Sequence, residues 1–131
     1  MTQKEIEIIL ARQLADHLST PIFIVDAAGT MLFYNPPAEK LLGLRFEETG
    51  EIPAAEWSTV FNPVDDDGTP LAPESLPLMI ALVERRPAHR EFLIQGLDSV
   101  RRRIQVTAMP VIGHAGRFLG AISIFWEVPA G

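Results

Sequence analysis

The segments Val100-Arg-Arg-Arg-Ile-Gln-Val-Thr-Ala-Met109 and Arg117-Phe-Leu-Gly-Ala-Ile-Ser-Ile-Phe-Trp-Glu-Val128 decide the fold. In the first segment, apolar and polar residues alternate from Ile104 to Ala108. This period of two is typical of a strand with one buried face. The stretch from Pro110 to Gly116 connects the segments. We therefore expect a long antiparallel hairpin.

The second segment is apolar on both faces. Its inward register is expected to hold Phe118, Gly120, Ile122, Ile124 and Trp126. Its outer face would then hold Leu119, Ala121, Ser123 and Phe125. A strand that is apolar on both sides must be covered on both sides, so we expect a core on one face of the sheet and a helix or a partner chain on the other.

Composition limits the class of protein. A chain of 131 residues with 47% apolar and 21% charged residues is typical of one globular domain. The net charge of -6 argues against nucleic acid as a partner. Because there is no cysteine, disulfides, thiolate metal sites, cysteine nucleophiles and thiol-linked chromophores are excluded. The apolar runs are of strand length and the N-terminal segment is acidic, so we expect a cytoplasmic protein without membrane contact.

Two charged runs have ordinary explanations. The run from Arg101 to Arg103 is expected to pair with surface acids at a strand end, with a docking site as the alternative. The run Asp65-Asp-Asp-Gly68 resembles a calcium loop, but the fifth and sixth places hold Thr69 and Pro70 where an oxygen donor and a glycine are needed. We therefore predict a solvated turn and no metal site.

The N-terminal segment predicts a helix over residues 3–18 that begins with a Thr2/Glu5 capping box. At 100° per residue, one broad apolar face holds Ile6, Ile9, Leu10, Leu14 and Leu18. Ile8 falls nearly opposite this face. The helix is expected to lie on its own sheet, with Ile8 left over for a possible homodimer contact. Together with the outer face of the last strand, this gives a predicted dimer interface of Ile8, Leu119, Ala121 and Phe125.

The segments between this helix and the hairpin predict short elements separated by turn residues. We expect strands over 22–25 and 30–34, a helix over 36–42 capped by Asn35, an irregular stretch over 45–73 anchored by Trp57, a helix over 74–86, and a strand over 89–95. Residues 1–19 would form the N-terminal amphipathic helix region and residues 20–128 the domain proper.

Across residues 12 to 128 the chain resembles the PAS sensor-domain family. The resemblance rests on the order and spacing of Pro21-Ile-Phe-Ile-Val-Asp-Ala-Ala-Gly29, Leu32-Phe-Tyr-Asn-Pro-Pro-Ala38, Leu41-Leu-Gly43, Asp67-Gly-Thr-Pro-Leu71, Glu74-Ser-Leu-Pro-Leu78 and Gly120-Ala-Ile-Ser-Ile124. It implies an α+β fold with a five-stranded antiparallel sheet of order 2-1-5-4-3. Short helices would enclose a pocket over one face, with the N-terminal helix over the other.

The resemblance implies sensing and not catalysis, and it allows the known cofactors to be tested. Flavin sensors of the light-oxygen-voltage class use a cysteine, amide side chains and a glutamine, whereas this chain has no cysteine and has Ile94, Ile104 and Ile122 at the aligned positions. Haem sensors carry a histidine on the long helix, but here His89 lies just beyond it. Both cofactors are therefore disfavoured.

The expected pocket is mostly hydrocarbon. We predict that its lining consists of Phe23, Val25, Trp57, Leu78, Met79, Leu82, Phe92, Ile94, Ile104, Val106, Ile122 and Ile124. Such a pocket would take a small apolar ligand. The alternative is a closed core in a ligand-free module that relays signals through protein contacts. In either case the expected partners are a second copy of the chain and a signalling effector such as a histidine kinase or a regulator.

Overall fold

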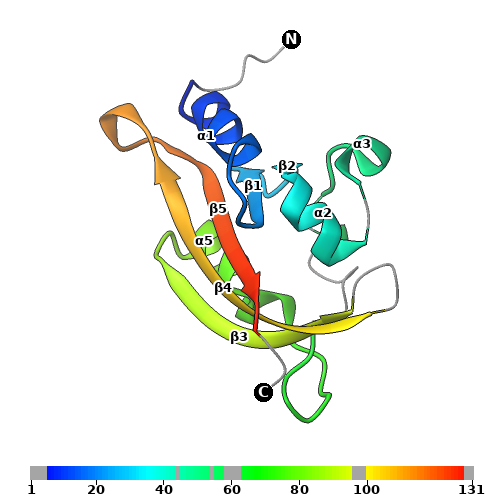
Figure 1. The fold of residues 1–131 in the computed structure, drawn as a ribbon. Helices are drawn as coiled ribbons and strands as arrows, with labels where there is room; N and C mark the ends of the chain where they lie inside the picture. The colour runs from blue at the N-terminus through cyan, green and yellow to red at the C-terminus, as the bar shows by residue number, and fades with distance from the viewer. Residues whose placement is uncertain (1–5, 44, 54, 58–62, 96–99, 129–131) are drawn as a thin grey trace.

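The hairpin expected from the C-terminal sequence lies in a five-stranded antiparallel sheet of order β2-β1-β5-β4-β3 (Figure 1). The computed structural model describes residues 6–43, 45–53, 55–57, 63–95 and 100–128. The strands are β1 (Ile22–Asp26), β2 (Met31–Tyr34), β3 (Ala88–Gln95), β4 (Arg101–Ile112) and β5 (Phe118–Glu127). The helices are α1 (Ile6–Asp16), α2 (Pro36–Leu42), α3 (Phe46–Thr49) and α5 (Pro77–Val83), with 3-10 turns η1 (Pro73–Ser75) and η2 (His114–Gly116). The predicted fold class and strand order are confirmed.

Several element boundaries differ from the prediction. Pro110 was expected to open the connection, but it pairs with Ala121 inside β4. The helix expected over 74–86 is divided into η1 and α5, and α5 begins at Pro77. Proline has no N–H to donate and favours the first helical position, so it starts a new helix here. The Thr2/Glu5 capping box lies outside the described residues.

Asn35 joins three elements at the start of the sheet. Its side chain is fully buried. The Oδ1 atom accepts hydrogen bonds from the backbone N–H groups of Ile22, at 3.0 Å, and Ala38, at 3.3 Å. The Nδ2 group donates to the carbonyl oxygens of Ala15 and Thr20, both at 2.9 Å. One side chain therefore caps α2, as predicted, and also ties the end of α1 to the start of β1.

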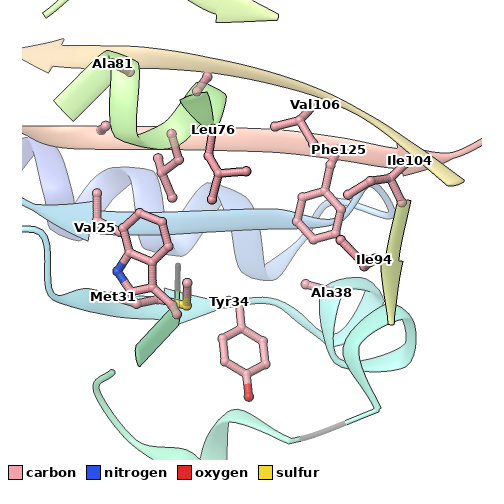
Figure 2. Packing of buried hydrophobic residues seen from close by; sticks show 14 of the residues in the cluster. Val25, Met31, Tyr34, Ala38, Leu76, Ala81, Ile94, Ile104, Val106 and Phe125 are labelled. Carbon is pink, nitrogen blue, oxygen red and sulfur yellow. The ribbon is translucent and has the colours of Figure 1, made fainter. Parts of the chain in front are cut away.

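Apolar side chains fill both sides of the sheet. On the side covered by α5, a cluster includes Val25, Phe92, Ile104, Val106 and Phe125, several of which Figure 2 shows converging. On the side covered by α1, a second cluster contains Ile8, Ala15, Ile22, Ile24, Leu32, Phe33 and Leu119. The two-sided burial expected from the last strand is therefore confirmed, and a helix of the same chain supplies the outer layer.

The register expected for β5 is wrong. Ala121 and Phe125 face the α5 side, whereas Ile122 and Ile124 pack against the cluster on the α1 side. Because both faces of this strand are apolar, a period of two cannot decide which face points to which layer. Leu119 remains on the α1 side, next to Gly120, whose φ of +148° interrupts the regular strand conformation.

Helix α1 presents a different face to the sheet from the one predicted. Ile8 and Ala15 are buried and Ala11 is packed against the same cluster. The large side chains of the expected packing face are exposed instead, namely Ile6, Ile9, Leu10, Leu14 and Leu18. Two alanines let the helix backbone approach the strands closely, and the Arg12 guanidinium, 4.7 Å from the centre of the Phe33 ring, covers the neighbouring surface.

Both edges of the sheet carry a short additional pairing. Ile52 forms an isolated antiparallel bridge with Met31 on β2, and its N–H donates to the Met31 carbonyl at 3.2 Å. Val64 bridges Leu93 on β3 in the same way, with reciprocal hydrogen bonds of 2.9 and 3.0 Å. The segment between α2 and α5, expected to be irregular, therefore contributes backbone partners to both outer strands.

The charged runs take up the roles predicted for ordinary surface groups. Arg103 Nη1 contacts Asp66 Oδ1 at 2.6 Å and Glu91 Oε2 at 3.0 Å, and these two acids raise the pKa of the arginine. In the Asp65 to Gly68 turn, Asp65 Oδ1 accepts hydrogen bonds from the N–H groups of Asp67 and Thr69. The first carboxylate of this run thus supports the turn.

None of the helices in the described ranges has the length and apolar character needed to cross a bilayer.

Candidate functional site

A partly open pocket of about 60 Å³ lies between the sheet and α5. It is lined by Phe23, Trp57, Pro63, Leu76, Pro77, Leu78, Phe92, Ile94, Ile104, Val106, Ser123 and Phe125. These residues come from β1, β3, β4, β5, the start of α5 and the segment that precedes it. A water molecule needs roughly 10–15 Å³ of such space, and a cavity of about 150 Å³ holds benzene. The pocket therefore suits a ligand of few atoms, or a longer one that extends through the mouth.

Most of the predicted lining residues meet at this pocket. Those that line it are Phe23, Trp57, Leu78, Phe92, Ile94, Ile104 and Val106. Val25, Met79 and Leu82 belong to the same hydrophobic cluster but do not line the pocket. The prediction that Ile122 and Ile124 face the pocket is wrong, because the register of β5 is inverted and both lie on the α1 side.

Sequence reasoning missed two pocket residues on β5, Ser123 and Phe125, because it placed them on the outer face. Phe125 is buried, and its ring packs edge-on against Phe23 with 4.8 Å between the ring centres. Figure 2 shows this ring pointing from β5 toward Ile94 and Ile104. Leu76, Pro63 and Pro77 were also missed. The only signal that could have found the β5 pair was a fixed register between β4 and β5.

Trp57 forms one wall of the pocket. Its ring is buried, and its indole N–H donates a hydrogen bond of 2.7 Å to the carbonyl oxygen of Gly29, in the turn between β1 and β2. The predicted role of Trp57 as an anchor is confirmed. Since the indole N–H is already paired, the tryptophan presents only hydrocarbon to the pocket.

The chemistry of the pocket is that of an apolar binding site. No ionisable side chain is among the lining residues that the structure describes. His89, the residue considered for haem, is exposed on β3, where Nδ1 lies 2.7 Å from the Thr107 hydroxyl. Within the described ranges, no three His, Asp or Glu side chains gather as a metal site would require. The pocket therefore offers shape and hydrocarbon contact to a ligand.

The four residues expected at a dimer interface are all buried within the chain. Ile8 is 5% exposed, Leu119 7%, Ala121 0% and Phe125 2%. Ile8 and Leu119 pack between α1 and the sheet, while Ala121 and Phe125 belong to the cluster under α5. This part of the prediction is corrected for the same two reasons given above, the inverted register of β5 and the rotated face of α1.

The exposed apolar residues of α1 form a separate surface. Ile6, Leu10 and Leu14 are 66%, 56% and 62% exposed and follow one another at intervals of four residues. They therefore lie along one side of the helix. We call these three residues the α1 stripe.

Comparison with known proteins agrees with this architecture. The PAS domain of BvgS from Bordetella pertussis superimposes with a TM-score of 0.65 at 16% identity, covering 95% of this chain and 87% of that chain. The PAS domain of nitrogen regulation protein NR(II) from Vibrio parahaemolyticus gives 0.62 at 16% identity, with coverages of 91% and 98%. The Rhodobacter sphaeroides LOV protein gives 0.71 at 15% identity, with coverages of 95% and 69%.

Comparison of the sequence identifies the family. A search of curated proteins found no match to this sequence. A family model described as PAS domain, however, matches residues 10–77, more than half of the 131-residue chain. The matched part runs from α1 to the first residue of α5. The chain therefore belongs to the PAS domain family.

Proposed function

We propose that this PAS domain is the sensor module of a cytoplasmic signalling protein and that it binds a small apolar ligand in the pocket under α5. The observation that carries this proposal is the pocket itself, which is lined mainly by hydrocarbon from β1, β3, β4 and β5 and by the ring of Trp57. Burying an ionised ligand there without a partner would cost several kcal/mol. An uncharged ligand is therefore favoured. A histidine kinase or a response regulator is the kind of effector that such a module would control.

We further propose that the domain uses neither haem nor flavin. Drug-sized ligands occupy pockets of roughly 300–1,000 Å³, several times the 60 Å³ found here. Ile94 and Ile104 line the pocket where a flavin would need amide side chains. Ile122 faces away from the pocket, so the expected alignment of this residue with the flavin glutamine is wrong, but the β5 residues that do line the pocket, Ser123 and Phe125, are not amides either.

Ligand binding can be tested with toluene as the probe. Toluene is larger than the enclosed space of about 60 Å³, so part of the molecule would extend through the mouth of the pocket. A Val106→Phe variant adds a ring to the pocket, so it should abolish the toluene-induced shift of the Trp57 indole N–H signal in NMR spectra. Its melting temperature should stay near that of the parent, because the ring fills empty space. Ile122→Phe, on the opposite side of the sheet, is the matched control and should leave the shift unchanged.

A closed core would give a different result. If the parent never responds to toluene and Val106→Phe lowers stability by about 1–3 kcal/mol, the value expected for overpacking, the domain is a ligand-free relay module. The small volume of the cavity is the observation that keeps this second function open.

We also propose that two copies of the domain associate through the α1 stripe. Three large aliphatic side chains lie side by side in water, an arrangement that association would relieve. A pair of helices related by a two-fold axis would bury the same stripe from both copies, as in the commonest closed assemblies.

Light scattering on the purified domain tests this association. We expect a dimer, and Leu10→Glu should convert it into a folded monomer. Val83→Glu, at an aliphatic position of α5 that is 70% exposed, makes the same change elsewhere and should leave the dimer intact. Ile8→Glu should instead unfold the domain, because it buries an unpaired charge. A monomeric parent protein at high concentration would refute the proposal.

A further inference from the structure

The Ser123 side chain is the exceptional group in the pocket. It is 2% exposed and lies in the middle of β5, where its backbone is paired with Phe23 on one side and Ala108 on the other. No hydrogen bond of its hydroxyl is found among the described residues, and no side-chain oxygen there is both buried and unpaired, so the Ser123 hydroxyl reaches the open space of the pocket. Trp57 carries the other polar side-chain group of the lining, and its N–H is already bonded to Gly29. Among the lining residues that the structure describes, Ser123 is therefore the one with a side-chain donor and acceptor to offer.

A hydroxyl that faces an apolar pocket can form hydrogen bonds only with protein groups around it or with what the pocket holds. The pocket residues next to Ser123 on the paired strands and on β5 offer no side-chain partner, because they are aromatic or aliphatic, Phe23, Val106 and Phe125 among them. A bound molecule that enters the pocket can therefore supply a partner for this hydroxyl.

From this geometry we infer that the pocket selects a small, neutral and mainly apolar molecule that carries one hydroxyl or carbonyl oxygen, and that this oxygen hydrogen-bonds to Ser123 Oγ. The inference rests on the ligand binding proposed above and adds the polar group that the ligand must carry. A charged group is not expected, because none of the described lining residues carries a charge that could pair with it. Ser123 is thus assigned as the residue that determines specificity within an otherwise apolar site.

Phenol and toluene are matched probes for this inference, because they have the same number of heavy atoms and differ in one hydroxyl. Their dissociation constants would be measured by NMR titration of the ¹⁵N-labelled full chain, with the Trp57 indole signal as the reporter. Ser123→Ala should weaken phenol binding by roughly two- to tenfold, the value of one hydrogen bond, and should leave toluene binding unchanged or slightly tighter. Ser19→Ala, which removes a hydroxyl from an exposed position, should change neither constant.

Each outcome decides the question. A loss of affinity confined to phenol in Ser123→Ala supports the inference. If both probes bind the parent and Ser123→Ala affects them equally or not at all, the inference is wrong while the proposed ligand binding stands. If neither probe binds the parent at millimolar concentration, the ligand-binding function fails and the inference with it. Should Ser123→Ala not fold, Ser123→Cys keeps the shape of the side chain with a somewhat larger atom, replaces the hydroxyl with a weak donor and should show the same phenol-specific loss.

Discussion

Replacing Asn35 by alanine should detach the N-terminal helix from the sheet. The substitution removes four hydrogen bonds from a fully buried side chain. Loss of the α2 cap alone costs about 1 kcal/mol. Each buried backbone group left without a partner adds roughly 1–3 kcal/mol, less where water can reach it, as at the part-buried Thr20 carbonyl. We therefore expect a total destabilisation of about 3–7 kcal/mol, which for a domain of this size lowers the melting temperature by roughly 10–30 °C.

Thermal unfolding followed by circular dichroism measures the loss, and hydrogen exchange locates it. Asn35→Ser should be less destabilised than Asn35→Ala by about 1 kcal/mol, because the serine hydroxyl still caps α2. Amide exchange should accelerate most in α1, whose last turn loses its bond from Asn35 to Ala15. Gln13→Ala, at an exposed site on the same helix, is the control and should change stability by less than about 0.5 kcal/mol. If Asn35→Ala lowers the melting temperature by less than about 5 °C, the hydrogen bonds of Asn35 are not what holds α1 on the sheet.

Three further outcomes are expected. Gly120→Ala should prevent folding or lower the melting temperature far more than Gly50→Ala, because a Cβ at Gly120 would collide with the Val25 carbonyl oxygen whereas the space around Gly50 is open; equal losses in thermal melts would contradict this. Trp57→Phe should cost about 1 kcal/mol or more in urea unfolding, since the bond from the indole N–H to Gly29 is lost; an unchanged midpoint would contradict the anchoring role. Freshly purified protein should show no haem or flavin absorption between 350 and 600 nm, roughly where these cofactors absorb, and a stoichiometric visible band would overturn that proposal.

Local signals in the sequence placed the strands approximately, whereas the strand order was an implication of the resemblance to the PAS family. Three patterns each allowed one interpretation. They are the alternation from Ile104 to Ala108, which predicts a strand, the prolines after Asn35, which predict the start of a helix, and the apolar pair Phe92 and Ile94, which predicts a strand with one buried face. In β5 the same reasoning failed. Its two faces are almost equally apolar, so the side that receives Phe125 and Ser123 depends on register with β1 and β4 and on the unusual backbone at Gly120. The pocket residues missed on this strand follow from that one ambiguity.

The prediction of which face of helix α1 is buried failed for a different reason. The angular pattern assigned the largest apolar side chains of the helix to the core, but the residues that pack against the sheet are Ile8, Ala11 and Ala15. Close approach of the helix to the strands is favoured by small residues, and a pattern weighted by hydrophobicity gives alanine little importance. The error has a useful consequence, because the large residues left in water, Leu10 and Leu14 among them, define the surface proposed for association.

The two bridges at the sheet edges bear on how this protein behaves at high concentration. A free edge strand is a template on which a second sheet can grow, and exposed edges are a common origin of aggregation. Here Ile52 pairs with the backbone of Met31 on β2, and Val64 pairs with the backbone of Leu93 on β3. Neither edge strand therefore offers an uninterrupted row of unpaired backbone groups. Continuous strand addition from a neighbouring molecule is therefore interrupted at both edges. Association through side chains on the faces of the domain, as proposed for the α1 stripe, is then favoured over growth into fibres.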